Sequence, residues 1–203
     1  MTRPSAINAP ERETQNRVLD VFRQQLGYRN LGNLHGQDNR NIRTTDLTSW
    51  LQQQGVADGL IGKTLHELEM AAAVGGARKL YDANKAVYQL LRYGVKIAPA
   101  AGEQTQTVWL VDWKNPHNND FAVAEEVSVK GEHDKRPDIV LYVNGLALGV
   151  LELKRSGVDM ATMAVVADII KHFAASALRI YIYNGEHMMA AFGAALCSPF
   201  VCI

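Results

Sequence analysis

The sequence has little cysteine and no apolar leader at its start. Only Cys197 and Cys202 occur among the 203 residues, so neither a disulfide framework nor a four-ligand zinc site can be built from cysteine. The amino terminus lacks the apolar core of a signal peptide, and Ser198-Pro199 interrupts the apolar carboxyl-terminal stretch. We therefore expect a soluble protein of the reducing cytoplasm with no membrane segment.

An excess of charge of either sign is also missing. Lys and Arg number 21, as do Asp and Glu, so the formal net charge is zero. Because phosphate contacts require a basic face, this balance alone is weak support for a nucleic-acid binder. Local charge is a better guide, since five basic residues gather in one part of the chain and could attract DNA there. They are Lys130, Lys135, Arg136, Lys154 and Arg155.

Among these residues, Lys135, Arg136 and Arg155 are our candidates for contacts with DNA. A solvated run of charge at the start of a strand explains Lys135 and Arg136 equally well.

The last residues of the chain have no charge at all, because no Asp, Glu, Lys or Arg occurs from His187 to Ile203. The whole chain is 47% hydrophobic, which is enough for a sizeable core, and it has no low-complexity segment. We predict one domain over residues 1–186 and an uncharged apolar tail over residues 187–203.

The most informative segment is a pair of apolar, strand-like runs around Asn144-Gly145. Asp138 opens the first run, and Glu152 and Lys154 close the second. Ionised side chains in such runs are costly unless they are paired or bind a metal. The segment therefore suggests a functional site.

The register of this hairpin decides whether the site can form. Side chains alternate along a strand, so Glu152 and Lys154 point to one face and the leucines beside them to the other. A plain two-residue loop would leave Asp138 on the leucine face. A three-residue loop or one bulge would instead place Asp138 opposite Glu152 and Val140 opposite Val150. We predict an odd-length loop or a bulge.

These residue types suit metal-dependent hydrolysis of a phosphodiester. Asp138 and Glu152 would each give a carboxylate oxygen to Mg²⁺, and the carbonyl of Leu153 could add a third ligand. The metal would acidify a water and neutralise charge on the phosphate, while Lys154 orients or deprotonates that water. The alternative is a surface hairpin in which Glu152 and Lys154 form a solvated pair.

The Pro-Asp and Glu-x-Lys pattern resembles that of restriction-endonuclease-like nucleases. Other stretches extend the resemblance, over about residues 11–157, to the beginning of a type I restriction enzyme R subunit. The stretches are residues 14–18, 26–32, 80–87, 91–95, 120–126 and 136–156.

That resemblance implies an α/β sandwich in which helices flank a mixed central sheet. It implies a Mg²⁺-dependent endonuclease domain that cuts double-stranded DNA, with methyltransferase and specificity subunits as partners in a restriction-modification complex. In the family an ATP-driven motor follows this domain, so ATP would be used there and not bound by this chain.

The sequence departs from the family after the Glu-x-Lys strand. Such nucleases usually have a helix with Gln and, four residues later, often Tyr, where this chain has Val166 and Ile170. No glutamine follows Lys154 at all. This difference favours an alternative, a noncatalytic or truncated remnant that binds DNA or partner subunits without cutting. The sequence leaves both possibilities open.

Periodicity predicts the other elements. Apolar spacing and Gly27 predict a first helix over Glu11 to Leu26, in which Glu11 or Glu13 is a candidate to approach the metal, although acids in a first turn are more often dipole partners. A loop is expected at 28–44, followed by three more helices. Alternating runs predict strands that join the hairpin in one sheet. These helices are at 45–54, 57–73 and 78–92, and these strands at 105–113, 121–130 and 180–183.

Several other features are better explained without a functional site. Residues 59–64 resemble a phosphate-binding loop, but Ala57 stands where that motif needs glycine, so Gly-Lys-Thr is expected on a helix surface. Three of the six histidines, His133, His172 and His187, have no metal-like spacing with one another. We expect the aromatic residues Trp109, Trp113 and Tyr142 to pack in the core or sheet.

Overall fold

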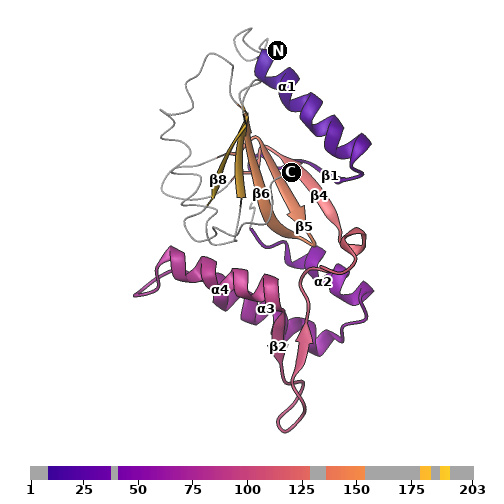
Figure 1. Cartoon of the computed structure of the whole chain (residues 1–203), viewed down its shortest axis with the longest axis vertical. Helices are drawn as coiled ribbons and strands as arrows, with labels where there is room; N and C mark the ends of the chain where they lie inside the picture. Colours follow the sequence, from indigo (N-terminus) through magenta and orange to yellow (C-terminus); the bar gives the residue numbers. More distant parts are fainter. Residues whose placement is uncertain (1–8, 38–40, 129–135, 154–178, 184–187, 193–203) are drawn as a thin grey trace.

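The structure is a computed structural model that describes residues 9–37, 41–128, 136–153, 179–183 and 188–192. These residues form an α/β fold with a mixed sheet, as predicted (Figure 1). The described helices are α1 (Ala9–Asp20), a π-helical turn (Val21–Gln25), α2 (Thr44–Gln53), α3 (Asp58–Ala72), α4 (Leu80–Tyr93) and a 3-10 turn (Pro116–Asn118). The described strands are β1 (Arg29–Asn33), β2 (Val95–Ile97), β3 (Gln106–Val108), β4 (Phe121–Glu125), β5 (Ile139–Val143), β6 (Leu146–Leu153), β7 (Arg179–Tyr183) and β8 (Met188–Phe192).

The main sheet has the strand order β1-β4-β5-β6-β7-β8. Strands β4, β5 and β6 are antiparallel to their neighbours in this group, whereas β1 runs parallel to β4 and β7 parallel to β6. The β5–β6 hairpin therefore lies in the middle of the sheet, where both strands have a partner on each side. Most residues of both strands are buried, and α1 covers the face that carries Ile139 and Leu153.

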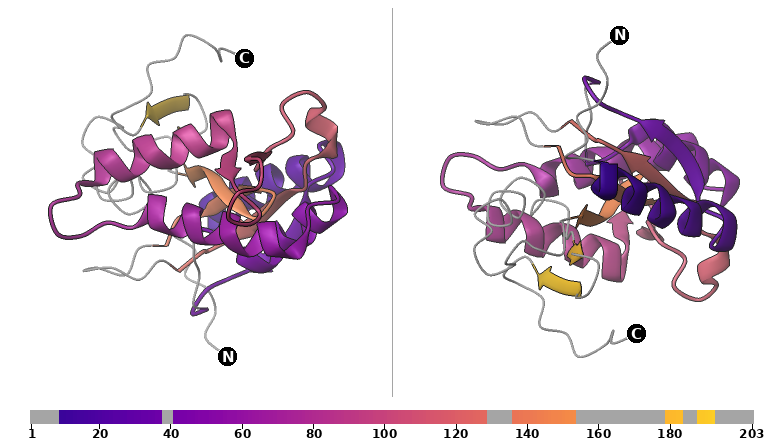
Figure 2. Two further views of the ribbon diagram at one scale, coloured as in Figure 1. Left: turned by 90° about the horizontal axis from the view of Figure 1, so that it is seen from below. Right: turned by 90° about the horizontal axis from the view of Figure 1, so that it is seen from above.

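Two apolar clusters hold the helices on the sheet. In the first, Leu19 of α1 packs with Val123, Ile139 and Leu153 from three neighbouring strands. The second joins α2, α3, α4 and the small β2–β3 hairpin to Leu146 at the start of β6. Figure 1 accordingly places α2, α3 and α4 together near the end of the sheet at which β5 meets β6, with α1 apart from them, and Figure 2 shows the same elements from below and above.

The central hairpin contains the bulge that the sequence predicts. Asn144 and Gly145 form a two-residue turn with φ of 52° and 79°, so Val143 pairs with Leu146. The register then shifts between Leu141 and Tyr142, and Val140 pairs with Val150. β6 has one extra residue at this point, which moves the residues that follow it to the opposite face relative to β5. A two-residue turn alone would not do this.

Two strand predictions were wrong. Residues 28–44 were expected as a loop, but β1 (Arg29–Asn33) adds a parallel strand at the edge of the sheet, with an irregularity at Gly32. The alternating run at 105–113 does not join the main sheet, because only Gln106–Val108 is a strand and it pairs with β2. Alternation predicts a strand without saying which strand is its partner.

The other elements agree with the predictions. The first helix ends in the π-helical turn before Gly27, whose φ is +70°, and α2, α3 and α4 lie where three helices were expected. Strands β4 and β7 were also expected. Residues 59–64, which resemble a phosphate-binding loop, lie in α3. Lys63 donates from the helix surface to the carbonyls of Ala98 and Pro99, as predicted for a helix surface. Throughout the described ranges, no helix is long and apolar enough to cross a membrane.

Burial of Tyr142 predicts a loss of stability at alkaline pH. Its ring is 1% exposed, and burial raises the pKa of Tyr142 to about 12 from its ordinary value near 10. Between these values the unfolded chain loses the phenolic proton while the folded chain keeps it, so the stabilising effect present below pH 10 is lost as the pH rises. The wild type should lose about 1 kcal/mol more than Tyr142→Phe between about pH 9 and pH 11.

Urea unfolding at each pH measures this difference. Tyr93→Phe is the matched control, because it removes the same hydroxyl group from a residue that is 62% exposed. Parallel profiles for the wild type and Tyr142→Phe would contradict the prediction.

Candidate active site at the open end of the hairpin

Asp138 and Glu152 lie at the end of the hairpin away from the Asn144-Gly145 turn. Ile139 pairs with Leu151, so continuing the register by one residue puts Asp138 opposite Glu152. Residues opposite each other in an antiparallel pair share a face of the sheet. The bulge thus puts both carboxylates on one face, whereas Leu151 and Leu153 pack on the other face with α1.

Two main-chain contacts hold Asp138 in place. Its Oδ2 accepts a hydrogen bond from the Leu153 N–H at 2.6 Å, which ties the carboxylate to the end of β6 beside Glu152. Its carbonyl accepts from the Glu126 N–H at 3.0 Å. Glu152 is only 5% exposed. A carboxylate at this depth is costly unless its charge is compensated, which distinguishes Glu152 from an ordinary surface residue.

Gln15 of α1 makes a third contact with Asp138, and this contact was not predicted from the sequence. The side chain of Gln15 is 4% exposed, and its Nε2 donates to the Asp138 carbonyl at 3.1 Å. A signal was present in the sequence. Gln15 is four residues before Leu19 and seven before Phe22, so it lies on the apolar face of the helix, where a polar residue requires a partner.

Four charged residues surround this contact and are called the rim cluster below. Arg12 bridges Glu125 at 3.2 Å and Glu126 at 3.5 Å, and Arg136 bridges Glu126 at 2.7 Å. Both arginine side chains are about half exposed. Arg136, a predicted DNA contact, thus lies close to Asp138 and is ion-paired with Glu126.

Other predicted site residues cannot be compared with the structure. Lys154, Lys130, Lys135, Arg155, His133, His172, His187, Val166, Ile170, Cys197 and Cys202 lie outside the described residues. Glu13 is exposed on α1, the helix that packs on the leucine face. The side chain of Glu11 is not described, so its predicted approach to the metal stays a prediction.

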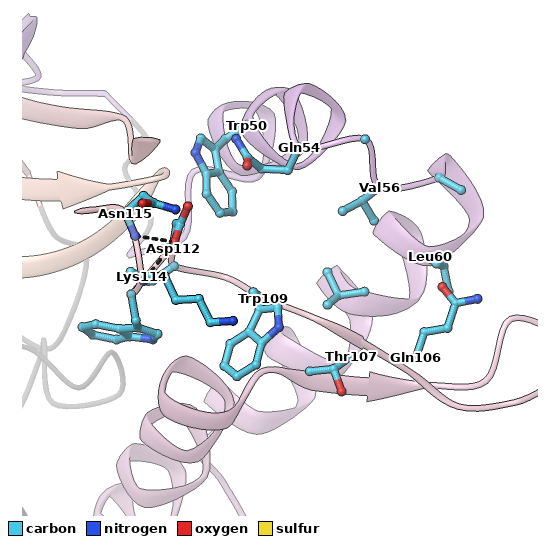
Figure 3. A pocket seen from close by; sticks show the side chains of 15 residues that line it. Trp50, Gln54, Val56, Leu60, Gln106, Thr107, Trp109, Asp112, Lys114 and Asn115 are labelled. Atoms are coloured by element: carbon cyan, nitrogen blue, oxygen red, sulfur yellow. Dashed lines mark hydrogen bonds between the residues drawn. The ribbon is translucent and has the colours of Figure 1, made fainter. Parts of the chain in front are cut away.

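A pocket lies away from Asp138 and Glu152, beside the loop between β3 and β4. Its volume is about 620 Å³, and Trp109 and Trp113 line it together with Lys114, from the connection after β3 (Figure 3). Their exposed fractions, 49% and 50%, overturn the prediction that these tryptophans pack in the core, while that prediction holds for Tyr142. The carboxylate of Asp112 in this loop accepts from the Asn115 N–H and Asn118 Nδ2, which lowers the pKa of Asp112.

Comparison with known proteins identifies the family. Residues 8–179 match the family described as "Type I restriction enzyme R protein N terminus". The chain belongs to this family. The site on the open end of the hairpin is therefore part of the amino-terminal domain of a type I R subunit.

Individual relatives of this R-subunit domain agree. A type I restriction enzyme HindI endonuclease subunit from Haemophilus influenzae is 30% identical over 105 residues, which is 50% of this chain and 10% of the relative. Two putative type I endonuclease subunits from Methanocaldococcus jannaschii, MjaVIIIP and MjaIXP, are 29% and 34% identical over 40% and 34% of this chain and 8% and 7% of their own lengths. The chain thus spans a tenth or less of these relatives.

A metal ion is expected in a nuclease family, and the donor atoms suit a hard cation. The side chains of Asp138 and Glu152 offer only oxygen, the donor that Mg²⁺ prefers. Over the described part of the chain, no group of three or more His, Cys, Asp or Glu side chains is placed to hold a metal. Main-chain carbonyls, waters and the DNA itself can complete the coordination shell of Mg²⁺, which usually keeps several waters.

Proposed function

We propose that this R-subunit domain is the DNA-cleaving module of a type I restriction enzyme, which hydrolyses phosphodiester bonds of double-stranded DNA with Mg²⁺. One observation carries the proposal. The bulge in β6 brings Asp138 and Glu152 to the same face, and the 2.6 Å contact between Asp138 Oδ2 and Leu153 N fixes the carboxylate there. A hairpin without the bulge would separate the two acids.

The residues at the open end of the hairpin would have separate roles in metal binding and in activation of water. Asp138, Glu152 and the carbonyl of Leu153 would hold the metal, which when bound supplies positive charge that acidifies a water and neutralises charge on the phosphate. Lys154 would orient that water or take its proton. The low exposure of Glu152 strengthens its electrostatic interaction with any cation at the site.

DNA would approach along the rim cluster. Arg136 is half exposed, and together with Lys135 and Arg155 it would contact the phosphates. An arginine paired with Glu126 can exchange that partner for a phosphate without being left uncompensated. The methyltransferase and specificity subunits would be the partners of the whole cytoplasmic R subunit, and ATP would be used by its motor.

A noncatalytic module is the alternative, and Val166 and Ile170 favour it, because the Gln and Tyr common in such nucleases are missing. Metal binding separates the two possibilities. A remnant that only binds DNA or partner subunits has no need to keep two carboxylates competent for a cation.

Calorimetric titration of Mn²⁺ tests the proposal on the purified chain, alone and with a short DNA duplex. Asp138→Asn should weaken Mn²⁺ binding at least about tenfold. The asparagine oxygen can still accept from the Leu153 N–H, so the substitution removes charge and keeps the local contact. Circular dichroism confirms that each protein is folded.

Glu69→Gln is the matched control, since Glu69 is exposed on α3 far along the chain from the site. It should bind Mn²⁺ like the wild type. Equal binding by the wild type and Asp138→Asn, or no binding by the folded wild type in the presence of duplex, would refute the metal-dependent nuclease and favour the remnant.

A further inference from the structure

The main chain at Asp138 is held from two sides although Asp138 lies just before β5 begins. Its carbonyl accepts from Gln15 Nε2 at 3.1 Å and from the Glu126 N–H at 3.0 Å. The Glu126 backbone has φ of +50°, a left-handed conformation that costs a residue with a Cβ atom. The Asp138 carbonyl is thus held by a strained residue, Glu126, and by the buried side-chain amide of Gln15.

Gln15 is in turn oriented by the rim cluster. Its Oε1 accepts from Arg12 Nη1 at 3.1 Å, and Arg12 Nη2 is 3.2 Å from Glu125 Oε2. Because a guanidinium can only donate, the oxygen of the Gln15 amide must face Arg12, and its nitrogen therefore faces the Asp138 carbonyl. The amide thus connects an exposed ion pair to the peptide group of a proposed metal ligand.

Gln15 is also placed on a rigid part of the fold. Leu19, one helical turn later, is 3% exposed and packs with Ile139 and Leu153, the residues that follow Asp138 and Glu152. Packing thus fixes α1 relative to the two strand ends that carry Asp138 and Glu152. Groups that orient ligands from behind commonly change metal affinity by about 10-fold to 100-fold.

We propose that Gln15, oriented by Arg12, is a positioning residue that sets the Asp138 carboxylate in the geometry needed to bind the divalent cation. This inference rests on the proposed function. Gln15 touches neither metal nor DNA in this scheme. It acts only through the main chain of Asp138.

The test is Mn²⁺ affinity of the full 203-residue chain, measured by calorimetry at a temperature at which all variants are folded. Gln15→Met keeps the length of the side chain and removes the donor, so affinity should fall about tenfold. Arg12→Met breaks the same connection from an exposed position and should lower affinity by a smaller factor. Because Arg12 is about half exposed, this second variant tests the idea even if Gln15→Met does not fold.

Two controls separate positioning from simple destabilisation. Leu68→Val removes a methylene from the other apolar cluster, which joins α2, α3 and α4, and it should lower the melting temperature while leaving Mn²⁺ affinity unchanged. Arg17→Met matches Arg12→Met on the same helix, since the contact of Arg17 is with Thr14 and not with Gln15. It should change neither quantity.

The outcomes distinguish this inference from the proposed function. If Asp138→Asn loses affinity while Gln15→Met and Arg12→Met bind like the wild type, the positioning role is overturned and the proposed function stands. Affinity that falls equally in Leu68→Val and Gln15→Met also overturns it, because general destabilisation would then explain both. If Asp138→Asn itself binds like the wild type, the proposed function fails and the inference fails with it.

Discussion

Replacement of Glu152 by Gln is expected to lower DNA cleavage by about a hundredfold or more in a restriction complex that contains this domain. The substitution preserves the shape of a side chain that is 5% exposed, but removes the negative charge proposed to hold the cation. The chain spans a tenth or less of its relatives, so the assay should use the whole R subunit with its partner subunits and ATP. Linearisation of circular DNA over time measures the rate.

Three controls define this experiment. Glu69→Gln changes an exposed glutamate on α3 to the same neutral residue and should cleave at the wild-type rate. ATP hydrolysis by the Glu152→Gln complex should be normal, since the proposed site handles phosphodiesters and not ATP. The melting temperature should stay within about 3 °C of the wild type, because no atom is deleted and no cavity forms.

Cleavage at the wild-type rate by Glu152→Gln would contradict the assignment of Glu152. If cleavage and ATP hydrolysis fell together, the defect would lie in assembly of the complex and not in the proposed chemistry. We expect Glu152→Gln to lose DNA cleavage and to retain ATP hydrolysis.

The sequence was sufficient to predict the register of the hairpin, because alternation imposes a strict parity. Asp138 and Glu152 can share a face only if one residue is added to the loop or to a strand. The choice between these two solutions could not be made, since both restore the parity. The structure has a two-residue turn with positive φ at Asn144 and Gly145 and places the extra residue in β6.

The sequence failed where the outcome depended on tertiary partners. The edge strand β1 has the composition of a loop, and it pairs with β4, almost a hundred residues later in the chain. The run with Trp109 and Trp113 alternates like a sheet strand, yet it borders an open hollow. Gln15 was missed for the same reason, since the need for a buried partner can be read from its helix face but the partner cannot.

Gly145 lies in the turn at the closed end of the same hairpin. Gly145→Ala is expected to lower the free energy of unfolding by about 3 kcal/mol or more. The φ of +79° alone accounts for about 1 kcal/mol. A Cβ atom here would also lie 2.7 Å from the Arg43 carbonyl oxygen and 2.9 Å from the Leu47 nitrogen, both main-chain atoms that cannot rotate away.

The surroundings prevent this part of the chain from relaxing. The Gly145 carbonyl accepts from the Arg43 N–H at 2.8 Å, just before α2 begins. Asn144, fully buried, donates to the Leu110 carbonyl and to Asn119 Oδ1 and accepts from the Asp120 N–H. A shift of the turn that relieved the new Cβ atom would lengthen several of these bonds in a buried place, where each lost bond is costly.

Gly102→Ala is the control, and urea unfolding measures the free energy of unfolding of both variants. The comparison separates the cost of the steric clash at Gly145 from the cost of a positive φ alone. Gly102 has φ of +85°, but a Cβ atom added to it would meet nothing within 4 Å, so this variant should lose only the conformational part, about 1 kcal/mol. An equal loss in the two variants would show that the turn can move and that α2 is not fixed to the hairpin. A larger loss for Gly145→Ala means that the register bringing Asp138 opposite Glu152 is secured at its far end by the contact between the turn and α2.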